Sequence, residues 1–148
     1  MNVSWVKGVT GFFLGGFMGL AWAASPVGVW QTIDDETGKE RSIVRITEVN
    51  GELQGVVEQI FDQPGDDPKH LCDKCKGDRK DKPIVGMTIL WGLKQNGKEW
   101  SGGEILDPKK GRIYRCKLTP SGDGKQLDVR GFIGFALIGR TQTWHRLQ

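Results

Sequence analysis

Residues 42–61 read SIVRITEVNGELQGVVEQIF, two runs of β-branched and other apolar residues on either side of Asn50-Gly51. Asn-Gly is the strongest two-residue hairpin signal, because both positions tolerate the positive φ that a tight turn of this kind requires. In the second run Leu53, Val57 and Phe61 fall on one face of an extended chain. The stretch therefore predicts two antiparallel strands, at 42–49 and 53–61.

The same alternation of short apolar runs and turn residues continues in both directions. It predicts further strands at 27–33, 85–93, 99–106, 112–119, 126–132 and 138–147. No segment after residue 23 shows a sustained helical period. About eight strands, joined mostly by hairpins, must close on themselves or leave two exposed edges. We therefore predict an all-β fold, a small antiparallel up-and-down β-barrel, with a β-sandwich as the alternative.

Length and composition exclude several classes of protein. A chain of 148 residues suits one folded domain, and a net charge of +3 gives no electrostatic footprint for nucleic acid. Six Trp and six Phe supply more apolar surface than a disordered chain carries. Three Cys are too few for a disulfide-dense scaffold.

The first 23 residues are predicted to be a cleaved secretory signal peptide. Lys7 is their one charged residue, residues 8–22 are uncharged, and Ala21 and Ala23 suit a signal peptidase. The uncharged stretch of 15 residues is short for a membrane-spanning helix, which needs about 20, so no transmembrane anchor is expected after cleavage. Residues 24–148 are then expected to be one periplasmic domain of 125 residues with a net charge of +2.

One connection is much longer than the hairpin turns. Residues 62–82 are polar and contain Cys72 and Cys75, the spacing of redox and metal sites. In an oxidising compartment a local disulfide is the favoured interpretation. Thiol–disulfide exchange and a metal site that includes His70 are the alternatives. The basic run at 76–82 is interpreted as a solvated loop, with contact to an anionic surface as the alternative.

Particular residue strings resemble a known family. They are Gly28-Val29-Trp30, 83–87 (PIVGM), 100–108 (WSGGEILDP), Gly111, Tyr114, 129–131 (VRG) and 139–144 (GRTQTW). Together they resemble a bacterial secreted family called domain of unknown function 2147, over about residues 26–146. The resemblance implies a lipocalin-like barrel in the periplasm and no established activity. Gly28-Val29-Trp30 also resembles the Gly-x-Trp of lipocalins, which implies that Trp30 closes the barrel base beneath a basic residue of a late strand. Arg140 and Arg146 are the candidates for that residue.

A set of polar and aromatic side chains alternates along the later strands. If these faces point inward, the barrel interior holds a ligand-binding set, and a single β-bulge would reverse the assignment. The predicted ligand-binding residues are Trp100, Glu104, Tyr114, Arg140, Gln142 and Trp144. Among them, Arg140 with Gln142 is expected to orient a carboxylate or another anionic head of the ligand. The alternative is that the faces point outward or that Glu104 and Arg140 form a buried ion pair. Cys116, on the face of Tyr114, is expected to be a buried, inert thiol.

Catalytic motifs are missing from the sequence. It has no Gly-rich phosphate loop and no nucleophile elbow, and neither His70 nor His145 has an evident orienting acid. We therefore expect a non-enzymatic periplasmic protein, without cofactor or metal, that holds a small, partly apolar and optionally anionic ligand in the barrel. The alternatives are a filled barrel that acts through its surface in the envelope, and a thiol–disulfide or metal role for the Cys72–Cys75 loop.

Overall fold

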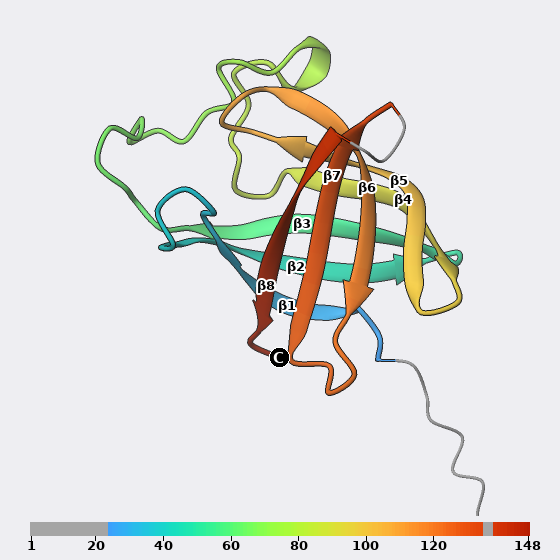
Figure 1. Ribbon diagram of the computed structural model, residues 1–148. Coiled ribbons are helices and arrows are strands. Elements are labelled where there is room, and N and C mark those ends of the chain that lie inside the picture. Colours follow the sequence, from blue (N-terminus) through green and yellow to red (C-terminus); the bar gives the residue numbers. More distant parts are fainter. Residues whose placement is uncertain (1–23, 135–137) are drawn as a thin grey trace, which may run out of the picture.

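The computed structural model describes residues 24–134 and 138–148. In this part of the chain, eight antiparallel strands form a closed barrel (Figure 1). The strands are β1 Gly28–Ile33, β2 Glu40–Val49, β3 Glu52–Ile60, β4 Thr88–Asn96, β5 Glu99–Asp107, β6 Arg112–Pro120, β7 Gln126–Ile133 and β8 Ile138–Arg146. Each pairs with its successor, and β8 returns to β1. The predicted up-and-down barrel is confirmed, and the sandwich is not formed. The predicted signal peptide at 1–23 lies outside the described residues.

The predicted central hairpin forms β2 and β3. Asn50 and Gly51 both have positive φ, 53° and 78°, as the tight turn requires. The register runs from Val49 opposite Glu52 to Ser42 opposite Ile60, with one irregularity at Ile43/Val44. Within the described residues, no helix is long and apolar enough to cross a membrane.

The end of the barrel where β1 meets β8 is filled. Trp30 is fully buried there, pairs with Arg146 across the two strands, and donates from Nε1 to the Pro26 carbonyl at 2.8 Å. The Arg146 guanidinium lies 4.3 Å from the Trp30 ring centroid. Of the two candidates for the basic residue over Trp30, the structure therefore selects Arg146. Gly28 is required beside it, because a Cβ there would overlap Arg146 Nη1 and lie 2.5 Å from the Gln148 carbonyl oxygen.

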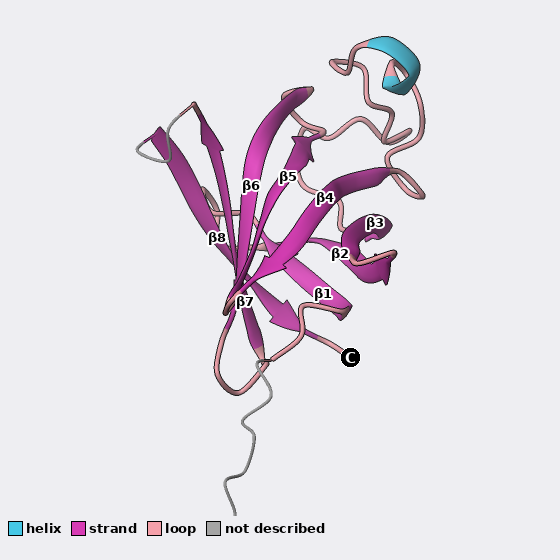
Figure 2. Cartoon of the chain, turned by 90° about the vertical axis from the view of Figure 1, so that its right-hand side faces the viewer, coloured by secondary structure: helices cyan, strands magenta, loops and turns pink. Residues whose placement is uncertain are grey.

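The opposite end carries the long connection between β3 and β4. It contains a short 3₁₀ helix, η1 Gly77–Arg79, and stands beyond the ends of β4 and β5 (Figure 2). Strand β4 begins at Thr88, three residues later than predicted, because a turn occupies the intervening positions. Gly86 has φ of 88°, and Met87 donates its N–H to the Ile84 carbonyl at 3.0 Å. A period-two pattern cannot distinguish such a turn from a strand.

Candidate functional site

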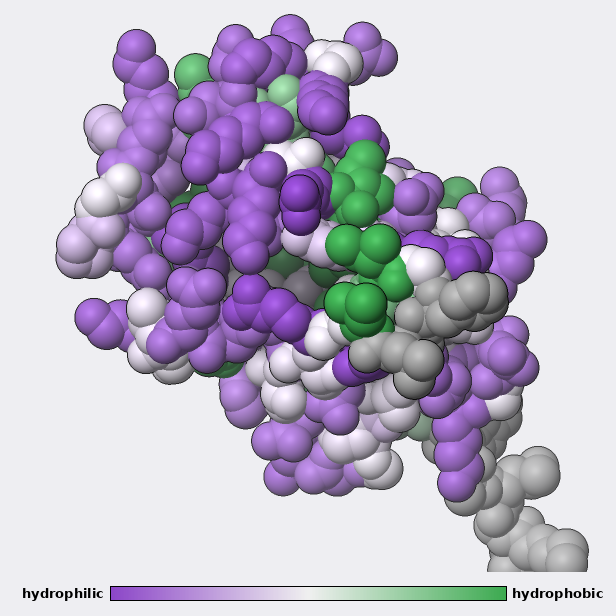
Figure 3. Space-filling view, turned by 45° about the horizontal axis from the view of Figure 1, so that its top comes forward, coloured by the Kyte–Doolittle hydropathy of each residue, from purple (hydrophilic) through white to green (hydrophobic). Residues whose placement is uncertain are grey.

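A cavity of about 890 Å³ occupies the open half of the barrel and continues beneath the long loop. Its inner wall is mostly apolar, and its mouth is mostly charged. The inner wall includes Val57, Ile60, Ile84, Ile89, Ile105, Tyr114, Val129 and Trp144. Figure 3 shows the open end, where the surface is hollowed beside a group of hydrophobic side chains. Both exposed isoleucines of the β7–β8 hairpin, Ile133 and Ile138, line this mouth.

The face of β8 that carries Arg140, Gln142 and Trp144 points into the cavity. Trp144 is buried and donates from Nε1 to Gln142 Oε1 at 3.2 Å, and Gln142 Nε2 in turn lies 3.4 Å from Asp35 Oδ1. Arg140 donates from Nε to Asp35 Oδ2 at 2.8 Å and also from Nη2 to the same oxygen. A polar chain thus leads from the buried indole to the β1–β2 turn.

The charge of Arg140 is compensated within the protein. Partial burial alone would raise the pKa of Asp35, but the hydrogen bonds and positive charge of Arg140 outweigh it and hold the pKa of this carboxyl below its usual value. Asp35 therefore stays ionised and occupies the guanidinium. An incoming anion would have to displace Asp35, so Arg140 does not offer the anion site that the sequence suggested.

A second arginine at the mouth is paired in the same way. Arg41 donates to both oxygens of Asp66, from Nη1 at 2.5 Å and from Nη2 at 3.2 Å. The Arg41 hydrogen bond is the main reason that the pKa of Asp66 is lowered. The His70 Nε2 atom lies 2.6 Å from Asp62 Oδ1.

The side chains of Asp62, Asp66 and His70 place one potential ligand atom each within 4.8 Å of the others, close enough for all three to reach one cation. However, the Arg41 guanidinium already binds both Asp66 oxygens, and a cation placed there would face this fixed positive charge. The pairing within the cluster accounts for its arrangement without a metal.

Two predicted site residues lie elsewhere. Trp100 is buried, but it is part of the core and does not line the cavity. Glu104 is exposed on the outside of the barrel, opposite Trp91 and Arg115. The reason is a β-bulge between Trp100 and Gly103, which exchanges the two faces of β5 and turns Ile105 inward instead. Four of the six predicted residues, Tyr114, Arg140, Gln142 and Trp144, line the cavity.

The cysteines divide as predicted. Cys72 and Cys75 form a disulfide, and both are buried against the barrel. The β5–β6 turn packs against this loop, and the Cys72 Sγ atom lies 3.6 Å from the Pro108 carbonyl oxygen. Cys116 is a free thiol buried among core residues, and desolvation raises its pKa to about 12. It is therefore a packing residue and not a nucleophile.

Sequence reasoning missed the partners that make up the mouth. Asp35 lies 105 positions from Arg140, and Arg41 lies 25 positions from Asp66. Asp35 belongs to a charged turn that has the composition of an ordinary solvated loop. No local pattern distinguishes it from Asp34, whose Oδ1 accepts backbone N–H groups within the turn.

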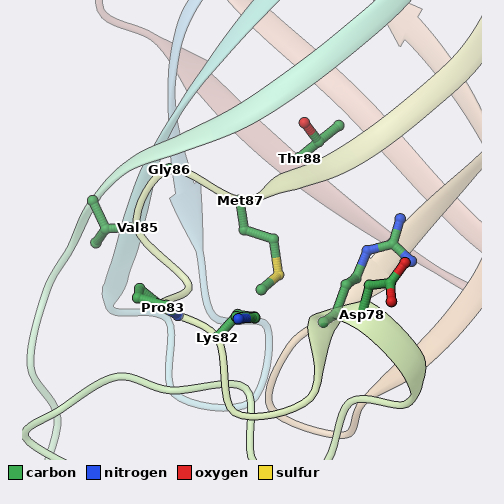
Figure 4. Close-up of a pocket in the computed structure, with 8 residues that line it drawn as sticks. Asp78, Lys82, Pro83, Val85, Gly86, Met87 and Thr88 are labelled. Carbon is green, nitrogen blue, oxygen red and sulfur yellow. The ribbon is translucent and has the colours of Figure 1, made fainter.

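A smaller hollow of about 390 Å³ lies between the long loop and the start of β4. In Figure 4 the side chain of Met87, the residue before β4, extends toward Lys82, whereas Val85 points away. Nearby, the Arg79 guanidinium lies 4.7 Å from the centroid of the Trp91 ring, on the outside of the barrel. These contacts hold the loop against β4.

The closed antiparallel barrel, with a filled base and a cavity at the other end, defines a lipocalin-like protein. A solved structure described as "Protein HP1028 from the human pathogen Helicobacter pylori belongs to the lipocalin family" is similar, with a TM-score of 0.72 and 21% sequence identity over 84% of each chain. The chain belongs to the family described as "Uncharacterized protein conserved in bacteria (DUF2147)", whose model matches residues 28–146. This confirms the resemblance inferred from the residue strings. A search of curated proteins found no match.

Proposed function

We propose that the protein is a non-enzymatic binding protein of the bacterial periplasm that holds one small, partly apolar molecule in its barrel. The cavity is the observation that carries the proposal. At about 890 Å³ it falls within the 300–1,000 Å³ that is typical of small-molecule sites, and it combines apolar walls with a few polar groups. A filled barrel acting through its surface would not need this space.

The polar groups of the inner wall are better suited to orienting a bound ligand than to catalysing a reaction on it. Tyr114 and the Trp144–Gln142 pair lie against the apolar wall. The hydroxyls of Thr32 and Ser42 lie 2.7 Å apart and satisfy each other. The buried Cys72–Cys75 disulfide supports a structural role for the loop over thiol exchange. The predicted signal peptide supports the periplasmic location.

The test uses a residue that can fill the cavity. A Cβ at Gly131 would meet Tyr114 and Ile105 at ordinary contact distances of 3.5–3.8 Å, so Gly131→Leu would project into the space without straining the backbone. The matched control is Gly122→Leu in the exposed β6–β7 turn, where a Cβ meets nothing within 4 Å.

Binding is measured with the neutral fluorophore N-phenyl-1-naphthylamine, together with native mass spectrometry of protein purified from the periplasm. We expect binding by the wild type and the control, and at least tenfold weaker binding by Gly131→Leu. A protein that is uniformly free of ligand and does not bind the fluorophore would overturn the proposal.

A further inference from the structure

Three lysines form one wall of the cavity mouth. Lys74 lies between the two cysteines of the long loop, and Lys109 and Lys110 lie in the turn between β5 and β6. The two segments are in direct backbone contact, since a Cβ at Gly111 would overlap the Lys74 carbonyl and lie 2.8 Å from the Cys75 nitrogen. The disulfide loop and the hairpin turn thus bring Lys74 beside Lys109 and Lys110, which follow it by 35 and 36 positions in the chain.

The ammonium groups of these lysines are not compensated as the arginines are. Within residues 24–134 and 138–148, no carboxylate oxygen forms an ion pair with the Nζ atom of Lys74, Lys109 or Lys110. The nearby Asp107 accepts the backbone N–H groups of Lys109 and Lys110 at 3.0 and 3.3 Å, which is a turn-forming role. Arg41 and Arg140, in contrast, are each held by an aspartate.

The segments that line the mouth therefore differ in net charge. The Cys72–Cys75 loop and the β5–β6 connection together contribute Lys74, Lys109, Lys110, Asp73 and Asp107 to the lining, a net charge of +1. In the remaining segments that line the mouth, two arginines are outnumbered by five carboxylates, a net charge of −3. These carboxylates are Asp34, Asp35, Glu36, Asp66 and Asp67. An anionic group at the mouth is attracted to the lysine-bearing segments and repelled by the others.

We propose that the ligand is a single-chain amphiphile with an anionic head, a carboxylate or a phosphate, which the Lys74–Lys109–Lys110 cluster holds while the apolar chain enters the barrel. The inference rests on the proposed binding function and adds the class of ligand and the position of its head. It moves the anion site from Arg140 on β8 to the disulfide loop and the β5–β6 turn. It also assigns a role to the disulfide loop, which fixes Lys74 beside the β5–β6 turn.

The experiment compares dodecanoate with 1-dodecanol, two probes of equal chain length that differ in charge, as competitors for N-phenyl-1-naphthylamine. The test variant is Lys109→Gln/Lys110→Gln, and the control with the same loss of charge is Lys98→Gln/Lys125→Gln, in exposed turns at the filled end. We expect dodecanoate to bind the test variant about fivefold more weakly, the ratio that corresponds to about 1 kcal/mol shared by two exposed ion pairs. Dodecanol should bind every protein equally, and added salt should weaken only dodecanoate.

The outcomes separate the two proposals. If the fluorophore does not bind, or if it binds and neither probe displaces it, the proposed binding function itself is wrong. If both probes bind but the lysine variant retains full affinity for dodecanoate, the ligand-binding function stands and the lysine site is wrong. A selective loss of dodecanoate in Arg140→Gln, with no loss in the lysine variant, would return the anion to β8 and also overturn the inference.

Discussion

Replacement of Arg146 by alanine tests whether the filled end closes the barrel. Arg146 donates to the carbonyl oxygens of Ser25, Val27, Gly124 and Gln148 and stacks on Trp30. A partly desolvated cation–π contact contributes about 1 kcal/mol. Four hydrogen bonds to carbonyls that water can reach after truncation contribute about 0.5 kcal/mol each. Arg146→Ala should therefore lower the free energy of unfolding by about 3 kcal/mol.

Urea unfolding followed by far-ultraviolet circular dichroism measures this loss, and thermal unfolding gives an independent value. For a domain of roughly 125 residues the entropy of unfolding is about 0.26 kcal/mol/K, so a loss of 3 kcal/mol lowers Tm by about 11 °C. The control is Arg112→Ala, an exposed arginine of β6, which should change stability by less than about 0.5 kcal/mol. A loss below about 1 kcal/mol for Arg146→Ala, or one equal to that of the control, would refute the reasoning.

Three further predictions concern the interior and the mouth. The Cys116 thiol, whose pKa is raised to about 12 by burial, should resist iodoacetamide at pH 8 in the native protein and react once the protein is unfolded in urea, as mass spectrometry can follow. Arg140 lowers the pKa of Asp35 in the folded protein, so the Asp35–Arg140 pair stabilises the fold fully above the unfolded-state pKa of about 3.9. This stabilisation is lost as the pH falls through the folded-state pKa of Asp35. Asp35→Asn should therefore cost up to about 1 kcal/mol at pH 7, and urea unfolding should show the difference disappearing by about pH 2. Gly103→Ala should lower stability by more than about 2 kcal/mol, since its Cβ would overlap a β4 carbonyl, whereas Gly122→Ala should be nearly neutral in the same assay.

The strand order was predictable because local signals define it. Turn residues such as Asn50-Gly51 indicate where the chain reverses, and the alternation of apolar and polar residues indicates which residues share a face of a strand. The last strand has no bulge, so the prediction that Arg140, Gln142 and Trp144 share one face is correct. That face points into the cavity. The filled end, in contrast, was expected from the family resemblance of Gly28-Val29-Trp30 and not from alternation.

The errors came from features that alternation cannot express. On β5 the positive φ of Gly102 and the close packing of Gly103 against β4 insert a bulge, so Glu104 faces solvent. The Gly-Gly pair was visible in the sequence, but whether it bends, bulges or continues the strand depends on the neighbouring strand. The ion pairs at the mouth join segments far apart in sequence, and only closure of the barrel brings Asp35 to Arg140.

The filled end is also where the two ends of the described chain meet. Val29 donates its N–H to the Gln148 carbonyl at 2.9 Å, and Arg146 ties the segment at Ser25 to the last strand. An affinity tag, a surface linker or a fused reporter attached at residue 148 would therefore project from the base and leave the mouth clear. The barrel can be immobilised on a resin with its entrance facing solution, an arrangement that suits a search of an extract for the proposed ligand. A circular permutant that joins these ends and opens at Gly97, in the exposed β4–β5 turn at the same base, would keep every strand pairing except one hairpin connection.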